Sequence, residues 1–186
     1  MKQMKKLCLT LLIIFMSLQL FATSLSNAGV TTGGTMKDEA FLLGVSYSTV
    51  QTADYSRNFG MGLGIHLNIS FLVADNETNG LFGALVGPCL EIRPLDKLSI
   101  AFVFGPAMVA ESGSFGIGGG LDFSVSWFFN DTFGVSIGGT AYPQFYINDD
   151  KRDTDFSFAG GGYVGLSWRK KTYSWDENVT YGPEKR

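Results

Sequence analysis

The sequence predicts an all-β fold in which long antiparallel strands follow one another in an up-and-down order. First, every second residue from Phe59 to Val73 is large and apolar, and the residues between them are mostly glycine, histidine, asparagine and serine. A strand turns successive side chains to opposite faces, so this segment has one apolar and one small, mostly polar face. Second, the same alternation recurs along the chain between polar turns. Third, helical periodicity is absent after the first 28 residues.

The first 28 residues have the composition of a secretory signal peptide. A basic start at 1–6 precedes an almost wholly apolar run at 7–21, and Ser26, Asn27 and Ala28 supply small residues before a cleavage point. The apolar run is too short for a transmembrane helix and has the wrong flanks. We therefore predict a signal peptide over 1–28, with a retained N-terminal anchor as the alternative.

Charge and cysteine content limit the partners and the covalent bonds that the chain could have. Cleavage after residue 28 removes three of the 14 lysines and arginines and none of the 17 acidic residues, which leaves a net charge of about −6. This balance argues against a nucleic-acid partner. Cys89 is then the one remaining cysteine, so no internal disulfide is expected in the single mature domain.

Seven segments show the strand alternation clearly, in the order 40–50, 59–73, 81–93, 98–109, 115–129, 133–147 and 156–168. The connections between them are polar and rich in turn-forming residues. Single-chain bacterial barrels have an even number of strands, so about eight are expected. The eighth strand could lie within 30–36, arise from a split of 66–92, or lie at 172–181.

The composition of the polar face indicates which face points inward. The seven segments contain three charged residues, Glu91, Arg93 and Asp122, and all three lie on the polar face. The rest of that face is largely glycine, serine, threonine, alanine and asparagine, which suits a narrow lumen better than a water-facing surface. The apolar face then contacts lipid. Because lipid does not tolerate an open sheet edge, such a chain must close into an antiparallel up-and-down transmembrane barrel.

Large aromatic residues recur on the apolar face at a separation of 12 positions. At about 3.3 Å per residue and a tilt of about 40–45°, this separation spans about 28–30 Å along the membrane normal. That length is close to the apolar band of an outer-membrane barrel. We interpret these residues as two aromatic girdles in outer-membrane lipid: Phe59 and Phe71, Phe115 and Trp127, Phe133 and Phe145, and Phe156 and Trp168.

Three prolines fall on the apolar face inside predicted strands: Pro88, Pro106 and Pro143. Proline cannot donate to the hydrogen-bond ladder of a sheet. These positions therefore count against the strand assignment unless bulges accommodate them.

Residues 40–168 resemble the small outer-membrane β-barrel proteins of bacteria, the porin-like and OmpA-type transmembrane barrels. The resemblance rests on the aromatic–turn–apolar junctions at 127–134 and 93–99 and on the closing strand at 160–168. It implies a barrel domain over 29–168 in the bacterial outer membrane, most simply a monomer. It also implies that the barrel-assembly machinery reads Trp168 as a terminal aromatic residue. Here the polar segment 169–186 follows, and we interpret it as a periplasmic tail.

Ionisable and aromatic side chains on the polar face form a candidate lumen cluster: His66, Glu91, Arg93, Asp122, Tyr142 and Tyr146, with Tyr163 on the same face. Buried charges must be paired or hydrogen-bonded. Eight strands leave an interior just wide enough for side chains, so we predict an internal polar network that fills the barrel. A selectivity ring in an open pore is the alternative.

Catalytic, metal and cofactor chemistry find little support in the sequence. His66 would need a nucleophile and an orienting acid, for which Ser70 and Asp122 are candidates by residue type alone. The acidic stretches at 75–79 and 149–155 do not fit the calcium-loop pattern, and the glycines at 116–120 lie inside a strand rather than in a phosphate loop. We predict no enzymatic activity, no cofactor and no metal site.

The sequence thus predicts an integral outer-membrane barrel that is structural and surface-presenting, or a narrow passive pore, with a lumen filled by polar side chains. Two alternatives stay open. A soluble exported barrel would turn the apolar face inward around a small apolar ligand. An outer-membrane hydrolase would use His66.

Overall fold

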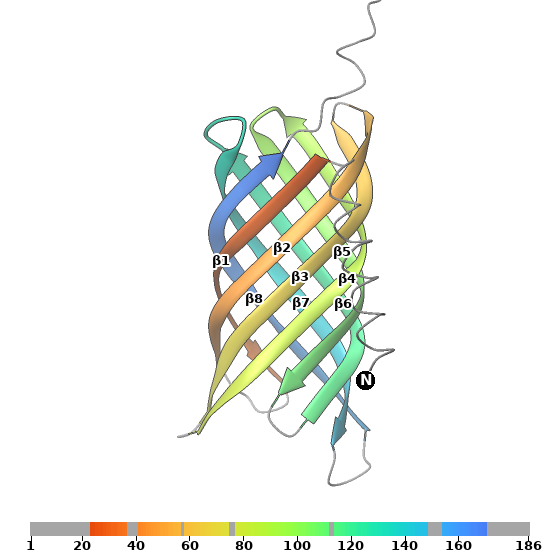
Figure 1. Cartoon of the computed structure of the whole chain (residues 1–186). Helices are drawn as coiled ribbons and strands as arrows, with labels where there is room; N and C mark the ends of the chain where they lie inside the picture. Colours follow the sequence, from red (N-terminus) through yellow and green to blue (C-terminus); the bar gives the residue numbers. More distant parts are fainter. Residues whose placement is uncertain are drawn as a thin grey trace, which may run out of the picture.

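The computed structural model describes residues 23–36, 41–56, 58–74, 77–111, 114–148 and 154–170. Within these ranges, eight antiparallel strands close into a barrel, because β1 pairs with β8 as well as with β2 (Figure 1). The strands are β1 (Thr23–Thr35), β2 (Phe41–Ser56), β3 (Phe59–Ala74), β4 (Glu77–Leu95), β5 (Leu98–Glu111), β6 (Ser114–Phe128), β7 (Phe133–Asn148) and β8 (Thr154–Lys170). The predicted all-β up-and-down barrel is confirmed.

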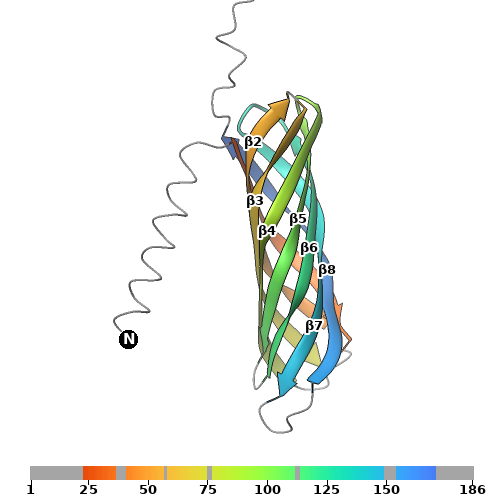
Figure 2. The ribbon, with the colours of Figure 1, turned by 90° about the vertical axis from the view of Figure 1, so that its right-hand side faces the viewer.

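The barrel is a slender cylinder of strongly tilted strands with two distinct ends (Figure 2). β1 begins and β8 ends at the upper end in Figure 1, which we call the terminal end. The β2–β3, β4–β5 and β6–β7 connections also lie at this end, because β2, β4 and β6 end there. At the opposite end, the far end, β1, β3, β5 and β7 finish. No helix in the described part of the chain is long and apolar enough to cross a membrane.

Side-chain hydrogen bonds in the turn between β6 and β7 explain why β6 ends and β7 begins there. The Asn130 side-chain oxygen accepts hydrogen bonds from the backbone amides of Thr132, at 2.9 Å, and Phe133, at 2.8 Å. Asparagine favours such turns because its side chain can replace a backbone acceptor. This local bonding satisfies amides that the ladder leaves unpaired at the end of the sheet.

The strand β1 begins earlier than the sequence predicts. Its residues Ser24–Ala28 pair with both β2 and β8, so the last part of the segment 1–28 belongs to the barrel. The barrel spans 23–170 rather than 29–168. The prediction missed this start because the residues at 23–28 are mostly small and polar. They therefore show no clear alternation of large apolar and polar positions. The signal peptide stays a prediction for 1–22, outside the described residues.

The eighth strand is β1, which contains the candidate segment 30–36 except for its last residue. The alternative split of 66–92 is wrong as a source of an extra strand, because β3 and β4 together cover that region as two of the eight strands. The third candidate, 172–181, lies outside the described residues.

The apolar face points outward. On β3, Leu63 is 51% exposed and Phe71 is 59% exposed, whereas Ser70 on the alternate face is 1% exposed. Other exposed apolar residues continue this pattern around the barrel, among them Val45, Val86, Phe104, Ile137, Val164 and Leu166. The soluble-barrel alternative required the opposite arrangement and is therefore excluded.

The prolines break the ladders without any bulge. Between β4 and β5, residues 86–88 and 104–106 have no ladder partners, although the register is the same on both sides of this gap. A similar gap between β6 and β7 spans 119–120 and 142–143. Each gap contains at least one of the prolines Pro88, Pro106 and Pro143. The sequence-based alternative of bulges at these positions is wrong, because the chain loses ladder bonds instead of gaining a residue.

The start of β1 leads to a prediction about export. If a signal peptide is cleaved, we expect the mature protein to begin at or before Thr23, because Ser24–Ala28 are bonded on both sides. N-terminal sequencing or intact mass of the protein recovered from the membrane fraction would measure this. A mature chain that begins at Gly29 would contradict the barrel described above.

Candidate functional site

The candidate site is the lumen, where inward side chains of the strands meet. Five of the six residues of the predicted cluster lie inside the barrel and are 2% exposed or less: His66, Glu91, Asp122, Tyr142 and Tyr146. The sixth, Arg93, also points inward, but its side chain is 14% exposed near the terminal end. The structure does not bring the six together as one group. They divide among layers at different depths.

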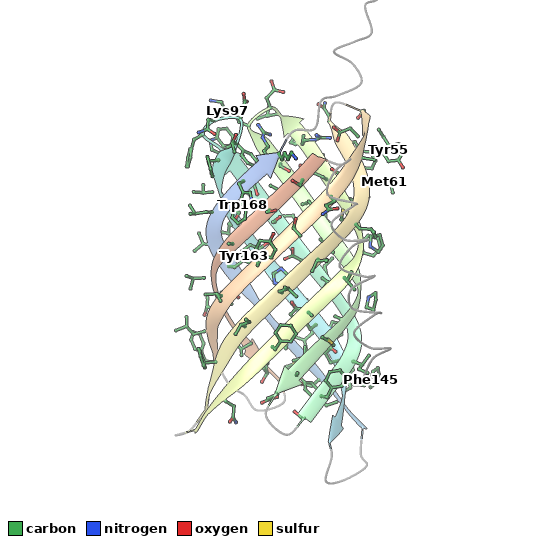
Figure 3. All side chains as sticks on the ribbon, in the orientation of Figure 1. Tyr55, Met61, Lys97, Phe145, Tyr163 and Trp168 are labelled. Carbon is green, nitrogen blue, oxygen red and sulfur yellow. The ribbon has the colours of Figure 1, made fainter. Side chains whose placement is uncertain are left out.

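The central layer is built around one carboxylate. His66 Nδ1 lies 3.1 Å from Asp122 Oδ1, a close polar contact without the alignment of a hydrogen bond. Tyr163 donates its hydroxyl to the same oxygen at 3.3 Å, and Figure 3 shows this tyrosine in the middle part of the barrel. The His66 ring also packs against two tyrosines, with centroid distances of 5.7 Å to Tyr163 and 6.4 Å to Tyr142. We call these four residues the central cluster.

A second polar group lies beside the central cluster and centres on Asn27. Its side-chain nitrogen donates to the hydroxyls of Ser48 and Ser124, each at 3.3 Å. Its oxygen accepts from Ser126 at 3.2 Å, and Ser126 in turn accepts from Ser167 at 3.1 Å. The amide thus ties together four strands across the lumen. Sequence reasoning missed Asn27 because it assigned this residue to the signal peptide.

Glu91 lies closer to the terminal end and is 1% exposed. Its two carboxylate oxygens accept hydrogen bonds from Thr52, at 2.9 Å, and Ser99, at 2.7 Å. Next to it, Arg93 forms an ion pair with Asp54. Asp54 was not predicted from the sequence, because β2 runs several residues past position 50, where the predicted strand ends.

Arg169 closes the terminal end. Its Nε donates to the backbone oxygen of Asp131 at 3.0 Å, and its Nη2 donates to that of Asp96 at 2.7 Å. Its guanidinium carbon lies 4.1 Å from the ring centroid of Phe128, which is fully buried. One side chain therefore fastens the end of β8 to two turns. The sequence analysis placed Arg169 in a tail, although it continues the inward positions 163, 165 and 167 of β8.

Little space is left between these groups. The void between Thr31, Leu42, Asn68, Leu81 and Tyr142 is too narrow to admit a water molecule. Across the described ranges, no three histidine, cysteine or acidic side chains come together as a metal ion would require. The lumen is a packed interior rather than a channel in this structure.

The predicted girdle residues lie on the outer face near both ends. Phe71, Phe115, Trp127, Phe133, Phe145 and Phe156 are exposed, and Phe59 and Trp168 are partly exposed. Figure 3 shows Trp168 toward the terminal end and Phe145 toward the far end. Trp168 packs against Tyr47, with ring centroids 6.2 Å apart, and Phe145 packs against Phe156, at 5.3 Å.

A closed ring of eight antiparallel strands with an apolar exterior and a polar interior defines the class of eight-stranded outer-membrane β-barrels. No protein-family model matches the sequence, and no curated protein matches it. Among solved structures, the chain is similar to Ail, the attachment invasion locus protein of Yersinia pestis, with 8% identity and a TM-score of 0.57 over 80% of this chain and 99% of that one.

Ail in complex with the heparin analogue sucrose octasulfate is also similar, with 9% identity and a TM-score of 0.54 over 80% of this chain and 99% of that chain. At these identities, the likeness establishes the fold alone.

We expect Asp122→Ala to lower the free energy of unfolding by about 2–4 kcal/mol, because His66 and Tyr163 would lose their shared buried partner. Urea titration of the protein refolded in phospholipid vesicles would measure the change. Asp54→Ala is the matched control, since it also removes a paired carboxylate, but one that is 29% exposed. The control should cost about 1 kcal/mol or less. Equal losses in the two variants would contradict the assigned role of the central cluster.

We expect Arg169→Lys to lower the free energy of unfolding by about 1–2 kcal/mol. Lysine keeps the charge but loses the planar fork that reaches two carbonyls and stacks on Phe128. The same urea titration applies, with Lys170→Arg as the control, because Lys170 is exposed on the outer face of β8. A stability unchanged by Arg169→Lys would show that the guanidinium does not fasten the turns.

Proposed function

We propose that this protein is an integral bacterial outer-membrane barrel with a closed lumen, and that its role is structural and surface-presenting rather than transport. The observation that carries the proposal is the combination of an apolar exterior with an interior filled by packed, largely polar side chains. The first feature supports a membrane location, and the second argues against a pore. The location and the closed state are separate claims with separate tests.

The exterior supports insertion into lipid on physical grounds. Bilayer interiors offer no hydrogen-bond partners, so only structures whose backbone groups pair internally can span them. A β1–β8 ladder that is continuous from Ser24 to Thr35 removes the sheet edges. Exposed apolar side chains such as Leu63 and Ile137 would be unfavourable in water over so large a contiguous surface. In a bilayer the same side chains contact acyl chains.

The barrel has an orientation that follows from its two ends. Short turns are typical of the periplasmic side of such barrels. The connections at the terminal end have two to four residues, whereas two of those at the far end, 36–40 and 149–153, have five. We therefore propose that the terminal end faces the periplasm and that the far end faces outward. This places the end closed by Arg169 on the periplasmic side.

The closed lumen argues against the narrow-pore alternative. A solute would have to displace Arg169 from two backbone oxygens, then separate Asp122 from its partners, and then pass Tyr142 and Tyr146. Each of the first two steps would leave a buried polar group without its partner, which costs about 1–3 kcal/mol for a neutral group and more for a charged one. The third step would require two large buried rings to move. The three layers together therefore support a non-conducting barrel.

The geometry also supports the absence of hydrolase activity. Ser70 donates its hydroxyl to Asn68 Oδ1 at 2.5 Å rather than to His66. His66, Ser70 and Asp122 are all 2% exposed or less, and the void near Tyr142 has no room for water. A nucleophilic mechanism needs a serine within reach of its base and a substrate within reach of both. Neither condition is met, so we propose that His66 packs and pairs within the lumen.

Conductance in planar bilayers tests the closed state. We expect the refolded wild-type protein to show no discrete current steps, whereas Tyr142→Ala combined with Tyr163→Ala should produce them, because two large side chains leave the lumen. Heat-modifiable mobility on SDS gels would confirm that each variant is folded. Discrete steps from the wild-type protein would overturn the closed-lumen proposal and favour the narrow pore.

A further inference from the structure

The seam between β4 and β5 lacks two backbone hydrogen-bond donors near the middle of both strands. The unchanged register sets Pro88 opposite Phe104 and Pro106 opposite Val86. Neither proline has an amide hydrogen, so neither can donate across the seam. An unpaired backbone group in a bilayer has no water to compensate it. The seam is therefore a weak line in the barrel wall at the depth of the acyl chains.

The second ladder gap, between β6 and β7, differs because a side chain compensates it. Gln144 Nε2 donates to the backbone oxygen of Gly119 at 3.1 Å. The lumen side of that gap is also occupied by Tyr142, which is 1% exposed. The β4–β5 gap has no such support. Its inward positions are Gly87 and Gly105, which carry no side chain.

The lumen wall beside the β4–β5 gap is apolar. Leu85, Cys89 and Val103 are each 1% exposed, and Ala107 is 5% exposed. None of these side chains offers a strong donor to the carbonyl groups of the gap, and the Cys89 thiol lies 3.9 Å from the backbone oxygen of Gln51 on another strand. The rest of the interior, which we call the polar wall, carries the central cluster and the Asn27 group. It begins directly beside the apolar wall, because His66 is paired in register with Leu85 and Asp122 with Val103.

The apolar wall packs on glycines of neighbouring strands. An added Cβ at Gly64 would meet the side chain of Val103, and one at Gly120 would meet those of Leu85 and Ala107. Leu85 and Val103 are each 1% exposed and fill the space over these glycines, so room behind the gap opens only when one of these two side chains moves.

We infer that the β4–β5 seam is a lateral opening through which an acyl chain of a membrane lipid enters the lumen beside Leu85 and Val103. On the outer side, Val86 is 50% exposed and Phe104 is 46% exposed, so hydrocarbon already lies against the gap in a bilayer. Opening an intact seam would break all of its ladder bonds, whereas the two bonds that Pro88 and Pro106 would donate are missing from the start. The apolar wall accepts a chain but provides no partners for a headgroup. This inference rests on the proposed membrane location.

Cys89 provides a native reporter, because it lies on the apolar wall two positions from Gly87. The protein would be refolded in phosphatidylcholine vesicles and treated with N-hexadecylmaleimide, which dissolves in the bilayer. A parallel sample would receive a sulfonated, membrane-impermeant maleimide. We expect Cys89 to react with the first reagent and not with the second. Mass spectrometry would measure the rate of each reaction.

The double variant Pro88→Ala and Pro106→Ala restores two amide donors across the seam. We expect it to slow the reaction of Cys89 with N-hexadecylmaleimide by about ten-fold, the factor that corresponds to roughly two ladder bonds of ordinary strength. Equal rates in the double variant and the wild-type protein would overturn the lateral opening. Reaction with the sulfonated reagent at a similar rate would also overturn it, because entry would then come from water.

Two control variants separate this inference from the membrane proposal, each built in a Cys89→Ala background. Leu63→Cys reports the outer face, and failure to react with N-hexadecylmaleimide there would overturn the membrane location itself. Ser136→Cys reports the polar wall, where the Ser136 hydroxyl is buried without a hydrogen-bond partner and its replacement therefore loses no bond. A Ser136→Cys rate as high as that of Cys89 would show general breathing instead of opening at the β4–β5 seam.

Discussion

The constraint on which the structure depends is closure of the sheet. A bilayer has no partner for a free backbone amide or carbonyl, so the first and last strands must pair with each other. The pairing of β1 with β8 runs from Ser24 to Thr35 without interruption. Glycines at Gly29 and Gly33 allow this close approach, because a Cβ at either position would meet backbone atoms of β8. β1 has the least clear strand pattern in the sequence, but closure requires it to be hydrogen-bonded on both sides like the other strands.

A second consequence of closure is a narrow interior, in which each large inward side chain needs a small residue beside it. A Cβ at Gly138 would meet the ring of Tyr163, and one at Gly116 would meet that of Tyr146 at 3.4 Å. Gly83 stands in the same relation to Tyr142. The glycine-rich polar face of the sequence is thus the complement of its inward tyrosines. The lumen reaches close packing with hydrogen-bonded residues as well as aliphatic ones, whereas the core of a soluble protein relies mainly on aliphatic residues.

The sequence was sufficient to predict the fold, because period-two alternation with large apolar residues survives in seven of the eight strands. The prediction failed at β1, because its outward residues Ala28 and Thr32 are too small to produce a recognisable apolar alternation. It placed His66 and Asp122 on one face but not at 3.1 Å, since that distance depends on strand register and tilt around the whole ring. Arg169 and Asp54 were missed for a related reason, because both lie where a strand continues past its last apolar residue.

The ladder defects and the division of the lumen are connected. Where the wall behind a proline carries polar side chains, one of them can take the place of the missing amide, as Gln144 does for Gly119. Where the wall is apolar, no such replacement exists, and the defect between β4 and β5 stays uncompensated. Two prolines on facing strands remove donors in the same place, and a sequence selected for stability alone would gain by replacing either one. Pro88 and Pro106 lie diagonally across the same seam, in front of the apolar wall. This placement favours a functional role, a seam that can open, rather than a defect that the fold merely tolerates.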